Sequence, residues 1–182
     1  MFYKSSKAYN LVVHKFGEKL YSSIESTITS LLNEMAVLIE GSTGDLFLEE
    51  LDRKCTAHNK ALQVIRAIVL YMDNIFIPST HKTPVRELGL NLWRDIIIHT
   101  IKIQMRLLEL VEIERGDGSI NRGLMKNVVN MLLRSFGSSS YQEYFEKPFL
   151  VATADFYRGE SQLLIESCGC GDYLKIVEKT VK

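Results

Sequence analysis

Residues 61–77 read Ala-Leu-Gln-Val-Ile-Arg-Ala-Ile-Val-Leu-Tyr-Met-Asp-Asn-Ile-Phe-Ile, and this stretch decides the fold class. Its apolar residues recur every three or four positions: Leu62, Ile65, Val69, Met72 and Phe76. That spacing places them on one face of a single α-helix with about 3.6 residues per turn. We expect the helix to end at Ile77-Pro78, because a proline disfavours the helical conformation of the residue before it.

The same helical spacing continues on both sides of this stretch. It predicts further helices over residues 6–39, 85–113, 120–136 and 148–166, and a last helix that begins near Asp172. Loops rich in glycine or serine separate them, at residues 41–44, 115–118, 137–140 and 168–171. Ser119 or Asp117 can cap the helix over 120–136, and Pro148 suits a first helical turn. No convincing strand pattern is present, so we predict an all-α fold of long antiparallel helices joined by short loops.

Composition narrows the class of protein. The chain has 182 residues, of which 46% are apolar and 24% charged, and its 22 Lys and Arg balance its 22 Asp and Glu. A chain without net charge has no global field that attracts nucleic acid or an anionic membrane. We find neither the apolar core of a signal peptide nor a stretch of transmembrane length. Three cysteines without a framework spacing are typical of reduced thiols, so we expect a cytoplasmic or nuclear protein.

The sequence offers no catalytic constellation. The four histidines, His14, His58, His81 and His99, lie in different local contexts. No Gly-x-Ser-x-Gly elbow is present, and no cysteine carries the signature of a nucleophile. We therefore expect a protein that is not an enzyme and that needs no cofactor.

A zinc site is the strongest alternative from another functional class. Cys55 and His58 lie three residues apart in a predicted helix, and Cys168 and Cys170 lie in a tight turn. Together they could form a tetrahedral Cys3His site, as the centre of a zinc-dependent or thiol enzyme. Nothing in the sequence brings the two pairs together, however. One core cysteine and two loop cysteines is the interpretation that we favour.

Several blocks resemble the N-terminal repeats of the cullin family, most closely those of its cullin-3 branch in plants. They are VHKFGEKLY (13–21), HNKAL (58–62), GLNLWRD (89–95), NRGLM (121–125) and YFEKPFL (144–150). The blocks follow one another in a consistent order, and the resemblance extends from about Ala8 nearly to the C-terminus.

This resemblance implies a helical solenoid built from five-helix cullin repeats. Residues 1–182 would form a single N-terminal region, with an incomplete first repeat up to about residue 78 and helices that lead into the second repeat from about residue 85. The resemblance further implies a non-catalytic scaffold that binds a BTB-domain substrate adaptor of a cullin-RING ubiquitin ligase, in ubiquitin-dependent protein catabolism. The first helix of the first repeat and the C-terminal cullin homology region are lacking, so we expect no RING protein as a partner.

The family's adaptor face comes mainly from the second and fifth helices of the first repeat. Carried over by position, Tyr9 and Tyr71 match aromatic residues on that face, and tyrosine suits a partner surface because its ring can be buried while its hydroxyl stays wet. Asn74 belongs to the same predicted site but stands where an arginine is usual, and Ser5 stands where the family has a second contacting tyrosine. These departures favour a rival hypothesis, a degenerate truncated fragment with no stable partner.

Overall fold

The computed structural model describes residues 5–99, 103–116 and 118–167, without the side chains of residues 5, 6, 134–140 and 144. In chain order the elements are α1 (Ser5–Val13), α2 (Gly17–Glu40), α3 (Gly44–Ile68), η1 (Met72–Phe76), α4 (Ile77–Thr80), α5 (Val85–Trp93), η2 (Arg94–His99), α6 (Ile103–Arg115), α7 (Arg122–Tyr141), η3 (Gln142–Glu146) and α8 (Lys147–Ser167), where η marks a π-helical turn. The described residues contain no strand, which confirms the prediction of an all-α fold.

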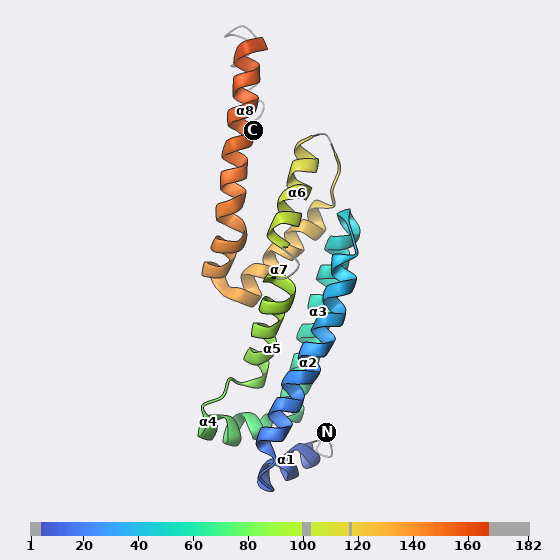
Figure 1. The fold of residues 1–182 in the computed structure, drawn as a ribbon, viewed down its shortest axis with the longest axis vertical. Helices are drawn as coiled ribbons and strands as arrows, with labels where there is room; N and C mark the ends of the chain where they lie inside the picture. The colour runs from blue at the N-terminus through green and yellow to red at the C-terminus, as the bar shows by residue number, and fades with distance from the viewer. Residues whose placement is uncertain (1–4, 100–102, 117, 168–182) are drawn as a thin grey trace. The chain divides into compact units, whose positions relative to one another are not determined.

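The chain divides into two compact units, Met1–Tyr141 and Gln142–Lys182. In the first, α2 and α3 form an antiparallel pair, α5 packs against both, and α7 packs along α3 (Figure 1). The largest fully buried side chains of this unit are those of Val85, Trp93, Phe47, Met72, Leu32, Leu48, Leu51, Leu62, Leu107, Ile39, Ile97 and Ile103. The predicted boundary between repeats, near residues 78–85, stays a prediction.

In the second unit, η3 leads into α8. The helix agrees closely with the one predicted over 148–166, and Pro148 lies in its first turn. The rings of Phe145 and Phe149 stack at a centroid distance of 5.6 Å across the start of the helix. The last predicted helix, from about Asp172, lies outside the described residues.

The single helix predicted over 6–39 is wrong, because the chain breaks between α1 and α2. Lys15 adopts a left-handed conformation with φ of 66°, and the amide of Phe16 donates a hydrogen bond to the carbonyl of Leu11 at 2.8 Å. This arrangement ends a helix in the same way as a C-terminal glycine does, although lysine occupies the left-handed position here. The next helix begins at Gly17, where a Cβ atom would lie 2.6 Å from the ring of Phe76.

The helix predicted to run from Leu62 to Ile77 is also interrupted. α3 ends at Ile68, and the helical segment Met72–Thr80 that follows is bent by 76° from it. Pro78 does not end a helix, contrary to the prediction, because it lies in the first turn of α4, where its missing amide hydrogen is tolerated. The chain instead leaves the helix at His81, which is left-handed with φ of 53°.

Three further details differ from the prediction. The region 85–113 is helical as far as it is described, but η2 is π-helical and α6 continues to Arg115. Asn121, not Ser119, caps α7: its Oδ1 accepts a hydrogen bond from the amide of Leu124 at 3.0 Å. Asp117, the other predicted cap, lies outside the described residues. The predicted loop at 137–140 is helical, since the propensity cost of one glycine is only about 1 kcal/mol.

A close contact between α3 and α5 holds the first unit together. A Cβ atom on Gly89 would overlap Cδ2 of Leu62, which is buried, so any larger residue would require Leu62 to move. His58 crosses the same contact, with Nε2 3.0 Å from the carbonyl oxygen of Gly89 and its ring stacked on Trp93 at 5.0 Å. Since a carbonyl only accepts hydrogen bonds, Nε2 carries the proton and the imidazole is a structural donor.

The state of His58 makes stability depend on pH. Burial lowers the pKa of His58 below its ordinary value of 6.5, and the hydrogen bond to Gly89 opposes this only in part. Near and below pH 6.5 the unfolded chain therefore binds a proton more readily than the folded chain does, and the free energy of unfolding falls as the pH drops. We expect a loss of up to about 1.4 kcal/mol at about pH 5.5, measured by urea denaturation. His58→Gln, which keeps a donor but does not titrate, serves as the control, and an equal pH dependence in both proteins would contradict the assignment.

Among the described residues, no single helix is both long enough and apolar enough to cross a membrane. The segments Gly44–Ile68 and Met72–Thr80 meet those criteria only when taken together, and they are bent by 76° where they meet. Apolar side chains of α3 such as Leu48 and Leu51 are fully buried inside the protein, as expected for a core helix.

Candidate protein-interaction face

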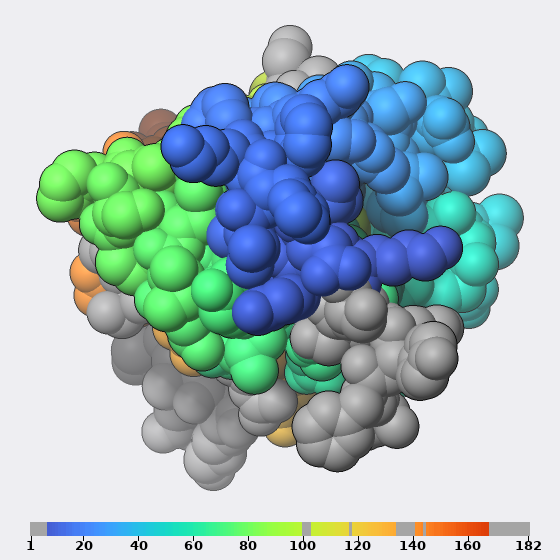
Figure 2. Space-filling model, turned by 90° about the horizontal axis from the view of Figure 1, so that it is seen from below, coloured from blue at the N-terminus to red at the C-terminus, as the bar shows by residue number. Residues whose placement is uncertain are grey.

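The N-terminal helix meets the bend after α3 at one end of the first unit. α1 packs against α2, α3 and η1, and the 76° bend after α3 turns η1 across the same end (Figure 1). Ala8 anchors α1 there, because it is buried in one cluster with Val69, Met72 and residues of α2, α4 and α5. Figure 2 looks directly at this end and shows α1, in dark blue, lying across its centre.

The structure brings Tyr9 and Tyr71 into direct contact. Their ring centroids are 4.6 Å apart with an angle of 61° between the rings, which is the edge-to-face arrangement that aromatic pairs prefer. Tyr9 is 44% exposed and Tyr71 is half-buried. Asn74 follows on η1 with an exposed side chain. Ser5, the other residue that departs from the family pattern, begins α1, but its side chain lies outside the described residues.

Two apolar residues beside Tyr71 also belong to this face and were missed. Leu70 is 48% exposed and Ile75 is 54% exposed, on either side of Tyr71 in the chain. The helical period did not reveal them, because the π-helical turn over Met72–Phe76 changes which side chains of this segment are exposed. We define the tyrosine face as Tyr9, Leu70, Tyr71, Asn74 and Ile75.

Polar contacts fix the segment after α4 onto α2 and so hold this end in shape. Lys82 forms an ion pair with Glu18 at 2.8 Å, and its ammonium group lies 4.7 Å from the centroid of the Tyr21 ring. The hydroxyl of Tyr21 donates a hydrogen bond to the carbonyl of Thr83 at 2.9 Å. Burial raises the pKa of Tyr21, so the hydroxyl keeps its proton and remains a donor. The hydrogen bond to Glu18 likewise raises the pKa of Lys82.

The zinc hypothesis gains no support from the residues that are described. Among them, no group of three or more His, Cys, Asp and Glu side chains is placed to hold a metal ion. Cys55 is buried, and His58 uses Nε2 to bind the backbone of Gly89. Cys168 and Cys170 lie outside the described residues.

Comparisons with known proteins match nearly the whole chain to one family. The family model described as the cullin alpha solenoid domain matches residues 3–182. The chain is 56% identical over 176 residues to Cullin-3A of Arabidopsis thaliana and 52% identical over 176 residues to Cullin-3B of the same plant, with 94% of this chain covered in each case. It is 37% identical over 181 residues to Cullin-3 of Dictyostelium discoideum, with 96% of this chain covered. The chain spans about a quarter of the length of these relatives, 24%, 24% and 23% respectively.

Proposed function

The chain belongs to the cullin family, as its N-terminal repeat region, and from this membership we propose that it binds a BTB-domain substrate adaptor through the tyrosine face. The cullin family is one of non-catalytic scaffolds, which agrees with the prediction that the chain is not an enzyme. In this proposal the chain supplies the adaptor-binding part of a ubiquitin-ligase scaffold that acts in the cytoplasm or nucleus.

One observation carries the proposal: two tyrosines from distant parts of the sequence form an exposed aromatic pair. The ring centroids of Tyr9 and Tyr71 are 4.6 Å apart, yet Tyr9 is still 44% exposed. A partner that covers the pair would gain the burial of both rings without having to order them first. Tyrosine is also among the residues that dominate binding energy at protein interfaces.

The surroundings of the pair resemble the centre of an interface. Leu70 and Ile75, close to Tyr71 in the chain, add exposed apolar surface. None of the five residues of the tyrosine face carries a formal charge, and charged residues are depleted at the centres of protein interfaces. The tyrosine hydroxyls can meet a wet or polar rim on the partner.

Isothermal titration calorimetry with a panel of purified BTB domains tests the proposal. We expect at least one of them to bind the chain with a micromolar or lower dissociation constant. Circular dichroism and cooperative urea unfolding of the same preparation establish that the chain is folded. If a cooperatively folded chain binds no member of the panel, the adaptor proposal is wrong. If the chain does not unfold cooperatively, the rival hypothesis of a degenerate fragment is favoured instead.

Asn74 provides a gain-of-function prediction. Its side chain is exposed on η1, where the family usually has an arginine. We expect Asn74→Arg to tighten adaptor binding roughly threefold to tenfold, about 0.7 to 1.4 kcal/mol, because arginine supplies several donors in a fixed planar group. The matched control is Asn127→Arg, an exposed position on α7. Equal effects of the two substitutions would mean that only net charge matters, and Asn74 would then have no place in the site.

A further inference from the structure

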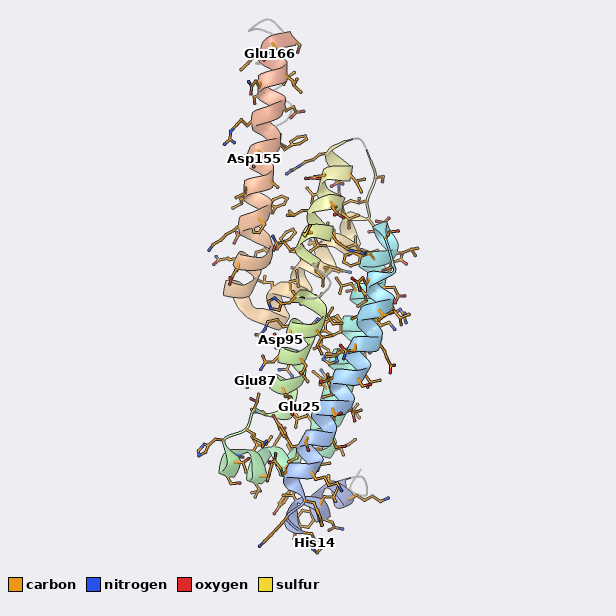
Figure 3. The ribbon with its side chains drawn as sticks, in the orientation of Figure 1. His14, Glu25, Glu87, Asp95, Asp155 and Glu166 are labelled. Atoms are coloured by element: carbon orange, nitrogen blue, oxygen red, sulfur yellow. The ribbon has the colours of Figure 1, made fainter. Side chains whose placement is uncertain are left out.

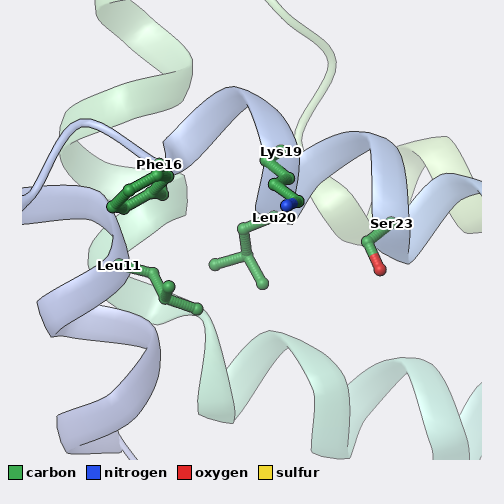
Figure 4. Close-up of a pocket in the computed structure, with 5 residues that line it drawn as sticks. All are labelled: Leu11, Phe16, Lys19, Leu20 and Ser23. Carbon is green, nitrogen blue, oxygen red and sulfur yellow. The ribbon is translucent and has the colours of Figure 1, made fainter.

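A surface pocket lies where α1 turns into α2. It has a volume of about 350 Å³ and is lined by Leu11, Phe16, Lys19, Leu20 and Ser23 (Figure 4). Leu11 comes from α1, Phe16 precedes the first residue of α2, and the other three follow on the first turns of α2. This volume is at the lower end of the range typical of small-molecule sites and suits one large side chain. We call it the turn pocket.

The turn pocket is separate from the tyrosine face. Successive residues of an α-helix are about 100° apart around its axis, so Tyr9 and Leu11 point about 200° apart on α1. Ala8 and Val12, which pack into the core cluster, lie between those two directions. The two surfaces therefore flank α1 on opposite sides, and a partner large enough to straddle this helix could contact both.

The pocket is apolar and already formed. Leu11 is 41% exposed and Phe16 is 53% exposed, while Leu20 packs its inner part against the core. The hydrogen bond from the Phe16 amide to the Leu11 carbonyl, at 2.8 Å, holds the two walls together. A ligand would thus find exposed apolar walls that need no rearrangement.

Lysines lie in and near the pocket. Lys19 lines it, Lys15 occupies the adjoining turn next to His14, which Figure 3 labels, and Lys7 lies on α1. The carboxylate of the neighbouring Glu18 is engaged by Lys82 at 2.8 Å, so it does not offset these cations. Further along α2, the next acidic residue is Glu25, which lies beyond the lining of the pocket. Electrostatic complementarity then favours a partner with negative charge at the turn.

We propose that the turn pocket binds a bulky apolar side chain carried by an acidic segment of a partner protein. The inference rests on the proposed function only in identifying that partner as the adaptor. The apolar side chain fills the space between Leu11 and Phe16, and the acidic residues beside it meet Lys19 and Lys15.

A titration monitored by two-dimensional NMR tests the chemistry of the pocket without any adaptor. The probes are two synthetic peptides, acetyl-Asp-Asp-Trp-Asp-Asp-amide and acetyl-Lys-Lys-Trp-Lys-Lys-amide, added to the isotope-labelled full chain. We expect the acidic peptide to shift the amide signals of Leu11, Phe16 and Lys19 at least threefold more than the basic peptide does. Equal shifts from both peptides, or shifts located elsewhere, would overturn the inference.

Variants then separate the pocket from the tyrosine face. Leu11→Ser combined with Lys19→Glu should abolish the peptide shifts and weaken binding of a BTB domain at least fivefold. The matched control combines Val37→Ser with Lys126→Glu, which are exposed positions on α2 and α7, and should change neither readout. An adaptor that binds the pocket variant normally would overturn the inference while the proposed function stands. A dimer of the chain that the pocket variant dissociates, seen by analytical ultracentrifugation, would identify a second copy as the occupant and also overturn it.

Discussion

Replacing Tyr71 by alanine is expected to weaken binding of a BTB adaptor by roughly thirtyfold, about 2 kcal/mol. The substitution removes one ring of the pair. It also removes the surface that contacts the Tyr9 ring, whose centroid lies 4.6 Å from that of Tyr71. Tyr71 is only half-buried, so the fold should survive the change. Calorimetry with the tightest-binding BTB domain measures the loss, and circular dichroism checks the fold.

The contact between the rings adds a sharper test of the same prediction. Because Tyr9 and Tyr71 touch, the effects of Tyr9→Ala and Tyr71→Ala should not add in the double variant, with a coupling of at least about 0.5 kcal/mol. Tyr157→Ala is the matched control, since Tyr157 is 42% exposed and lies in the second unit. A Tyr71→Ala loss no larger than that of Tyr157→Ala would show that the tyrosine face does not bind the adaptor.

Trp93→Ala is expected to cause the largest loss of stability, about 3 to 5 kcal/mol. Trp93 is 1% exposed at the end of α5, and its ring stacks on His58 at 5.0 Å. Removing the ring leaves a cavity between α3 and α5, where the close approach at Gly89 limits how far the helices can relax. Urea denaturation followed by circular dichroism gives the change in the free energy of unfolding.

Trp93→Phe separates the ring from its polar atom. The Nε1 of Trp93 is buried without a hydrogen-bond partner among the described residues, so phenylalanine removes an unsatisfied donor as well as volume. We expect the cost to be below about 1.5 kcal/mol, much less than for alanine. Equal losses for the two variants would mean that Nε1 makes a hydrogen bond important to the fold.

The fold class was predictable from the sequence because apolar spacing reports on helices directly. That spacing holds through α2, α3 and α8, and the predicted bounds agree closely at both ends of α8 and at the end of α2. Breaks were predicted less well, since they depend on backbone conformation. The left-handed residue that ends α1 is Lys15, and no glycine marks that position. Conversely, the glycine and serines at 137–140 lie inside α7.

The candidate site was only partly predictable. Tyr9 and Tyr71 came from the resemblance, and their contact depends on the bend after Ile68, which the regular series through Val69 and Met72 concealed. The π-helical turn changes the number of residues per turn, so which face of the segment is exposed cannot be worked out from a 3.6-residue period. The turn pocket depends in the same way on the break at Lys15.

Amide hydrogen–deuterium exchange of the chain with and without a bound BTB domain tests the central claim most directly. The tyrosine face predicts that binding slows exchange in α1 and in residues 70–76, while exchange in α7 stays unchanged. Unaltered exchange in both of those segments, with protection elsewhere in the chain, would contradict the assignment of the adaptor to the tyrosine face.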